Sequence, residues 1–342
     1  MIKNIHFFLL GACIVLGSCL IATGDAVTAA QMSGSSSQAL LYLNCRAVSE
    51  DEIEFEFSQP VTVKSLNLEP ALEIASIQDG STVIIRLAEK TEPGILLTAD
   101  LLAEDKKKNT INVIVSFRSR NNRMPKLVIN ELCTEYANAA AGKKEEFIEL
   151  KMKSAGNLGA MRVFILGNTN AAKQTIYEFM PAEVKENEYV VLHLRQWDEF
   201  CKDEYSDNLD ESRSVNSSSN ARDFWIPGNT KLLQKKASTV YVLDQDDKVL
   251  DAVMLSETAD ALWQKEHFTE AAGFLFSQGA WKSIDGGIGR PQDAIISADT
   301  TNTRTICRDE TADNSNTALD WYITGTSCAT PGSANNVKRY SK

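Results

Sequence analysis

Residues Leu127 to Leu150 read LVINELCTEYANAAAGKKEEFIEL, and this stretch decides the fold that we expect for the chain. Two short apolar segments, 127–129 and 147–150, flank a run of small and charged residues, which is typical of two strands joined by an exposed loop. Both strands also carry acids, namely Glu131, Glu145, Glu146 and Glu149. Alternating apolar and charged side chains predict a sheet with one face in water.

A second stretch, DWYITGTSCATPGSANN from Asp320 to Asn336, is the expected partner of the first. Trp321 and Ile323 alternate with polar neighbours, as in a strand with one buried face. Thr330-Pro331-Gly332 then predicts the end of that strand. We expect both stretches to belong to one two-layered β body.

Four segments in this order resemble the lamin-tail domain of bacterial envelope proteins: Asn130-Glu131, Glu146 to Leu150, Asp320-Trp321 and Thr330 to Asn335. The resemblance implies a compact immunoglobulin-like β-sandwich in which the two glutamate-bearing strands hold the sandwich together. Where that family has an aromatic residue and Asn after its Glu-Leu, this chain has Lys151-Met152-Lys153. The matching region is also longer than a bare sandwich of about 100 residues, so inserts are expected.

Residues 1–18 predict a signal peptide, because Lys3 precedes a ten-residue apolar run from Phe7 to Leu16. Leu16-Gly17-Ser18-Cys19 resembles the lipobox of bacterial lipoproteins, which implies that Cys19 is lipidated and becomes the mature N-terminus. An ordinary secretory signal cleaved a few residues later is the alternative. Two or three acyl chains anchor a protein stably, so we expect a membrane tether. Residues 19–38, rich in small and polar side chains, predict a flexible link to the body.

Length and composition suggest two folded domains in a chain of 342 residues with 43% hydrophobic and 24% charged residues. The formal net charge is −11, and removal of residues 1–18 takes away only Lys3, which gives −11 − 1 = −12. An acidic chain is poorly suited to gripping phosphate backbones, so we expect no nucleic-acid partner.

Residues 39–119 predict a small all-β domain. Ile53 to Phe57 alternates apolar and acidic residues and predicts a half-buried strand that ends near Pro60. Further strands are expected at 82–87, 94–102 and 111–117. This spacing of about ten residues predicts a sandwich, and the pattern from Glu52 to Val61 resembles bacterial immunoglobulin-like spacer domains. Residues 120–125 are the predicted linker.

Residues 126–337 predict a second, larger sandwich, followed by a short tail at 338–342. Its further strands are expected at 161–166, 175–179, 189–194, 238–243 and 249–254. We expect an irregular acidic insert at 197–229 and a helical one at 256–300, with a helix over 258–277 capped by Ser256. The chain as a whole is thus predicted to be all-β, with two immunoglobulin-like sandwiches.

The irregular insert is rich in acids, and Ca²⁺ takes its ligands from such oxygen-bearing loops. Asp203, Asp207 and Asp210 are therefore candidate ligands of a structural Ca²⁺ ion, although the spacing of an EF-hand is absent. A solvated acidic surface without metal is the alternative, and we expect no other cofactor.

Few residues in this chain are suited to catalysis. His193 and His267 are the only histidines after the signal peptide, and each is more typical of a structural position than of a ligand or general base. Glu131, Glu146 and Glu149 are candidate paired carboxylates, with the structural role implied by the lamin-tail resemblance as the favoured interpretation. No zinc-hydrolase histidine spacing, nucleophile elbow or phosphate-binding loop is present in the sequence.

Five cysteines follow the proposed lipid site, and an exported chain can form disulfides. We favour Cys307 with Cys328, which lie near the terminal strands of the second sandwich. We expect the aromatics of the inserts, among them Phe224, Trp225 and Trp281, to pin the inserts to the core, and a recognition patch is the alternative.

An anchor, a tether and two β bodies without a catalytic constellation predict a lipid-anchored envelope protein that binds or scaffolds a protein or another envelope ligand. Leu20 follows Cys19, where an Asp would retain some lipoproteins at the inner membrane, so the outer membrane is favoured. A divalent-metal hydrolase built on the acidic inserts and a purely structural spacer are the alternatives.

Overall fold

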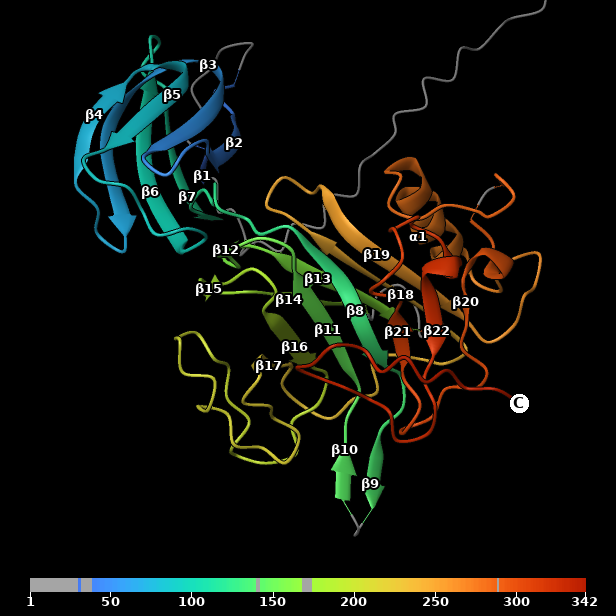
Figure 1. Cartoon of the computed structure of the whole chain (residues 1–342). Coiled ribbons are helices and arrows are strands. Elements are labelled where there is room, and N and C mark those ends of the chain that lie inside the picture. The colour runs from blue at the N-terminus through green and yellow to red at the C-terminus, as the bar shows by residue number, and fades with distance from the viewer. Residues whose placement is uncertain (1–29, 32–38, 140–141, 168–173, 288) are drawn as a thin grey trace, which may run out of the picture.

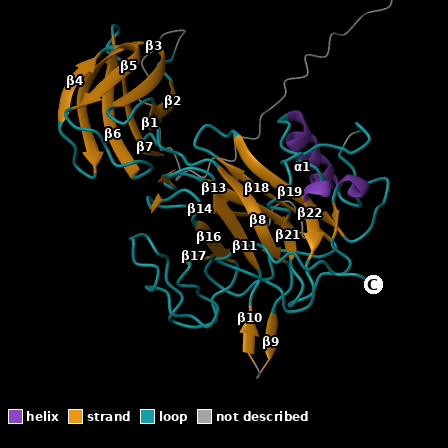
Figure 2. Cartoon of the chain, viewed as in Figure 1, coloured by secondary structure: helices purple, strands orange, loops and turns teal. Residues whose placement is uncertain are grey.

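The computed structural model describes residues 30–31, 39–139, 142–167, 174–287 and 289–342. Strands dominate these residues, with one α-helix, α1 (Glu266–Ser277), among them (Figure 2), so the all-β class is confirmed. The predicted signal peptide, Cys19 and most of the predicted tether lie outside the described residues. No helix in the described part of the chain has the length and apolarity needed to cross a membrane.

The first domain is a single seven-stranded sheet in the order β1-β7-β6-β3-β5-β4, with β2 paired to β3 (Figure 1). Its strands are β1 (Ala30–Gln31), β2 (Tyr42–Ala47), β3 (Glu52–Glu69), β4 (Ile74–Gln78), β5 (Gly80–Leu87), β6 (Leu96–Asp105) and β7 (Thr110–Arg118). The buried faces of β3, β5, β6 and β7 share one core, in which Phe55, Ile85, Leu101 and Val113 are fully buried. The sheet therefore curls around its own core.

The expected end of a strand at Pro60 was wrong, because β3 continues through this residue for nine more positions. Residues 52–57 of β3 pair with β2 and β5, whereas residues 61–69 pair with β6. Pro60 is exposed and lies at the change of partner, where no ladder hydrogen bond requires its missing N–H.

The second domain packs two sheets face to face. The six-stranded sheet has the order β17-β16-β11-β8-β21-β22, and the five-stranded sheet has the order β14-β13-β18-β19-β20. The first sheet comprises β8 (Leu127–Cys133), β11 (Phe147–Met152), β16 (Tyr189–His193), β17 (Ala221–Trp225), β21 (Ile306–Arg308) and β22 (Trp321–Ile323). The second comprises β13 (Arg162–Gly167), β14 (Thr175–Glu178), β18 (Ala237–Leu243), β19 (Val249–Ser256) and β20 (Ile295–Ile296). Two short pairs, β9 (Ala137–Ala139) with β10 (Gly142–Lys144) and β12 (Gly156–Asn157) with β15 (Glu183–Val184), flank them.

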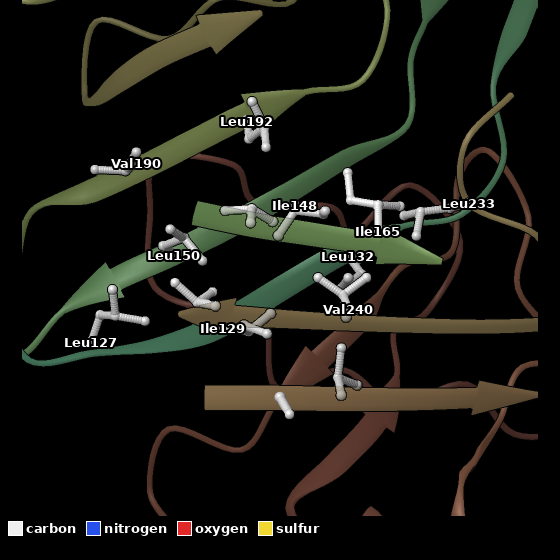
Figure 3. Close-up of a cluster of buried hydrophobic side chains, with 14 of the residues drawn as sticks. Leu127, Ile129, Leu132, Ile148, Leu150, Ile165, Val190, Leu192, Leu233 and Val240 are labelled. Atoms are coloured by element: carbon white, nitrogen blue, oxygen red, sulfur yellow. The ribbon is translucent and has the colours of Figure 1, made fainter. Parts of the chain in front are cut away.

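One hydrophobic core lies between these two sheets. Figure 3 shows side chains of both layers meeting there, among them Ile148 and Leu192 of the first sheet and Ile165 and Val240 of the second. Trp321 belongs to the same core as Ile148. The expectation that the two distant stretches close into one two-layered body is thus confirmed, while an immunoglobulin-like kinship stays a prediction.

The boundaries of both inserts differ from the prediction. Residues 221–225 of the acidic insert form β17, which pairs in parallel with β16 at the sheet edge. The helix begins at Glu266, eight residues later than expected, and its N-cap Lys265 makes no side-chain cap. Ser256 ends β19 and donates its hydroxyl to the Thr258 carbonyl instead, because the strand continues further than its apolar pattern suggested.

The predicted linker is fixed to the second domain. The buried Asn121 donates its Nδ2 to the carbonyls of Asn157 and Gly159, each at 2.8 Å. Gly94 of the first domain approaches Gly159 so closely that a Cβ on Gly94 would lie 2.3 Å from the Gly159 carbonyl carbon. The two domains thus meet backbone to backbone.

Candidate functional site

The glutamates of β8, of β11 and of the two positions before β11 are buried, so their expected position on a wet face was wrong. Glu131, Glu146 and Glu149 have no exposed surface, and Glu145 is 4% exposed. The sheet register places Glu149 directly opposite Glu131. The segment after β22 covers this face. Because that segment is distant in the sequence, nothing in the residues around the glutamates indicates that they are covered.

Glu131, Glu149 and Glu310 bind the segment Thr330–Asn335, and we call this arrangement the C-terminal clasp. Glu131 accepts the Thr330 backbone N–H at 3.0 Å, and Glu149 accepts that of Gly332 at 2.7 Å. Glu310 accepts the N–H of Asn335 at 3.1 Å. The clasp joins three of the four segments that carry the lamin-tail resemblance, and it supports a structural role for these carboxylates.

Burial changes the protonation of the clasp. It raises the pKa of Glu131, against the hydrogen bonds of Thr305 and Thr330 that lower it. Burial likewise raises the pKa of Glu149 to about 8, although Asn130 and Gly332 donate hydrogen bonds to it. Two facing carboxylates without a cation between them ionise less readily than isolated ones.

His193 is held between two carboxylates at one end of the six-stranded sheet. Its Nε2 lies 2.9 Å from Asp223 Oδ1 in a hydrogen bond. Its Nδ1 lies 2.8 Å from Glu145 Oε1, as an ion pair without hydrogen-bond alignment. The ring stacks on Trp225 at 3.9 Å. Burial lowers the pKa of His193, but the pairs with Asp223 and Glu145 outweigh it and raise that pKa to about 9, so the ring is charged at neutral pH.

The partners of His193 were missed by the sequence reasoning. Glu145 was expected in water, and Asp223 was hidden in a segment interpreted as an irregular insert. Only the parallel pairing of β16 with β17, which places Trp225 beside His193, brings Asp223 within reach of the ring. The aromatic pair Phe224-Trp225, a residue type that is enriched in strands, was a local signal for this strand.

A cavity of 380 Å³ opens above this centre, and we call it the loop-end pocket. Loops from distant parts of the chain surround it, and its lining includes Glu145, His193, Val215, Asn216, Ser218 and Pro331. Charged groups lie at its base, while Val215 is 64% exposed at its lining. The volume falls within the range of small-ligand sites.

The candidate Ca²⁺ ligands are not brought together. Asp203 accepts the Trp225 backbone N–H at 2.7 Å and the Tyr205 hydroxyl at 2.8 Å, so it fastens the insert to β17. Asp207 is 75% exposed and faces Lys185 at 3.8 Å, and Asp210 is exposed. No group of three or more His, Cys, Asp or Glu side chains in the described ranges is arranged to hold a metal ion.

The alternative of a recognition patch was wrong for three insert aromatics, because all of them are buried. Phe224, Trp225 and Trp281 are 0%, 2% and 1% exposed. Phe224 packs edge-on against Phe179 at 4.9 Å, and the Trp281 indole donates to the Asp293 carbonyl at 2.9 Å. The burial of these residues agrees with the expectation that they pin the inserts to the core.

The favoured disulfide is not formed. Cys307 is a buried free thiol on β21, and Cys328 is a half-exposed free thiol whose Sγ lies 3.5 Å from the Thr326 carbonyl. Burial also raises the pKa of Cys133 to about 12. The other described cysteines, Cys45, Cys133 and Cys201, are free as well.

Comparison with known proteins gives a family for the larger domain. The family model described as TP_1001 protein second domain matches residues 125–323, more than half of the chain. An uncharacterized protein of Treponema pallidum (strain Nichols) is 25% identical over 252 residues, which are 70% of this chain and 61% of that protein. The chain thus spans less than two thirds of the length of this relative. With a match across both sheets of the second domain, the chain belongs to the TP_1001 protein second-domain family.

Proposed function

We propose that this protein is a lipid-anchored component of a bacterial cell envelope that binds a protein or another envelope ligand without catalysis. Cys19 is the proposed lipid site, the outer membrane the proposed location, and the loop-end pocket the proposed binding site. The lamin-tail resemblance supports this role, because the segments that carry it form the C-terminal clasp and one wall of the pocket.

The observation that carries the proposal is the position of His193 between Glu145 and Asp223. A general base has to be neutral near the working pH and to reach its substrate, whereas this ring, with a pKa of about 9, is charged. The nearest thiol, Cys133, is a poor nucleophile because burial raises its pKa to about 12. Fixed charges of this kind are suited to holding a ligand in place.

The two alternatives have less support. A divalent-metal hydrolase depended on the acidic insert, whose Asp203 is bonded to backbone and tyrosine groups. A purely structural spacer would bind no ligand in the loop-end pocket, so an experiment that detects binding there distinguishes it from our proposal.

Photo-crosslinking in cells of the source organism tests the binding role. A photoreactive residue replaces Val215, which is exposed at the pocket, and a control chain carries it at Lys107, which is exposed on the first domain. We expect a discrete crosslinked species from position 215 that is lost when Asn216→Trp fills the pocket, and none from position 107. Equal crosslinking from both positions, or none from 215, would support the spacer instead.

Metabolic labelling with a fatty acid tests the anchor separately. The wild-type chain should incorporate the label and partition into the membrane fraction, and Cys19→Ala should do neither. Cys45→Ala is the matched control, because it removes a cysteine of the first domain without touching the proposed lipid site. Label on Cys19→Ala would show that the anchor assignment is wrong.

A further inference from the structure

A second cavity, of 660 Å³, lies between the two domains. Four arginines line it, Arg46 and Arg118 from the first domain, Arg120 from the linker and Arg162 from β13, and we call it the arginine cleft. Domain boundaries are frequent positions for small-ligand sites, and the volume is in their usual range. The cleft is distinct from the loop-end pocket, with which it shares no lining residue.

The charge of the cleft is opposite to that of the chain. Its lining carries four arginines against three acids, Glu178, Asp246 and Asp247, a balance of +1 in a protein of net charge −11. The side chains of Arg118 and Arg162 are 21% and 17% exposed, whereas those of Asp246 and Asp247 are 58% and 61% exposed. The guanidinium groups therefore lie deeper than these two carboxylates.

Two of these guanidinium groups keep donors that the protein does not use. Arg118 bonds Glu178 through Nε and reaches the Gly94 carbonyl only weakly through Nη1, at 3.4 Å, and its Nη2 has no partner in the described ranges. Arg162 uses Nη2 alone, for the Asp244 carbonyl at 3.0 Å and Asp247 at 2.6 Å. Its Nε and Nη1 are without partner among the residues that the structure describes. Such unused N–H groups of a guanidinium can donate charge-assisted hydrogen bonds to the oxygens of carboxylate and phosphate groups.

We propose that the arginine cleft binds a compact small-molecule polyanion carrying phosphate or carboxylate groups, held between Arg118 and Arg162. Such a ligand bonds to both domains at once, because Arg118 ends β7 and Arg162 begins β13. We expect the ligand to be a small anion, since Asp246 and Asp247 would repel the additional charges of a larger one. This site needs neither the lipid anchor nor the loop-end pocket, and it goes beyond the proposed function.

Isothermal titration calorimetry of the full chain in detergent tests the site, with pyrophosphate and citrate as separate probes at constant ionic strength. We expect saturable heat with at least one probe, and the responding probe identifies the anion class. Arg162→Gln should weaken that binding at least tenfold. Arg123→Gln is the matched control, because Arg123 makes the same kind of ion pair, with Glu183 at 2.6 Å, outside the cleft.

A second cleft variant protects the test against misfolding. Arg162→Lys keeps the positive charge but removes the fixed Nε and Nη1 donors, so it should fold like the wild type and still bind several-fold more weakly. Saturable heat that is the same in the wild type and in both Arg162 variants would overturn the proposal. The absence of saturable heat with both pyrophosphate and citrate would also overturn it.

Discussion

Glu149 makes the second domain less stable as the pH rises, and this effect is large enough to measure. Its folded-state pKa is about 8, against an ordinary value of 4.5. Between these values the folded protein holds a proton that the unfolded chain releases, so the free energy of unfolding falls with increasing pH. From pH 5 to pH 8.5 this single group removes about 4 kcal/mol. Glu149→Gln stays neutral throughout, and it should remove most of that decrease.

His193 also makes the free energy of unfolding fall as the pH rises, by a smaller amount. Its folded pKa of about 9 lies above its ordinary value of 6.5. Its stabilising effect is therefore complete below pH 6.5 and lost as the pH rises through 9, by about 2–3 kcal/mol over the same window. The Glu149→Gln variant should consequently keep a residual slope, to which Glu131, whose pKa burial also raises, adds in the same direction.

Urea unfolding followed by tryptophan fluorescence is a selective assay, because all five tryptophans lie in the second domain, at positions 197, 225, 263, 281 and 321. The control is Glu186→Gln, which neutralises an exposed acid of the same domain. Wild type and control should lose stability in parallel between pH 5 and pH 8.5, while Glu149→Gln loses much less. An equally steep decrease in Glu149→Gln would refute the reasoning about the clasp.

Three further results are expected. In urea unfolding, Phe224→Ala should destabilise the second domain by about 3–5 kcal/mol, because it leaves a cavity in the core. The control Leu262→Ala, at a side chain that is 76% exposed, should change the stability by less than about 0.5 kcal/mol. A thiol reagent should modify Cys328 in the native protein and Cys307 only after unfolding, and a reductant should leave the melting temperature unchanged. Protection of both cysteines in the native protein would indicate that they form a disulfide after all. Gly332→Ala should lower the melting temperature, because the φ of +80° disfavours a side chain and the new Cβ would lie 2.6 Å from the Ser218 hydroxyl. An unchanged melting temperature would contradict the tight packing of the clasp.

The strands of the second domain were predictable because their signal is local. Short runs rich in apolar and β-branched residues placed β13, β16, β18 and β19 within two residues of their observed bounds. Proline at position 60 misled the reasoning, because a proline tolerated at a change of strand partner looks in the sequence like a strand end. The late start of α1 was missed for a similar reason, since Ser256 resembles a helix cap but ends a strand.

The candidate sites were much less predictable, because burial depends on what covers a residue. Phe224, Trp225 and Trp281 resemble surface aromatics in their polar segments, and only packing against the core hides them. The charge of His193 likewise depends on Asp223, which reaches it through a parallel strand pairing that no spacing announces.

By itself, the sequence determined the all-β class and the positions of most strands, since side-chain periodicity is written within a few consecutive residues. Only the tertiary structure decided the protonation of the glutamates and the position of the arginine cleft. The bond from the Thr330 N–H to Glu131 spans 199 residues, and Arg118 and Arg162 line one cavity only because the two domains dock. Electrostatic environment is a property of neighbours in space, and it is set by contacts that no local pattern records.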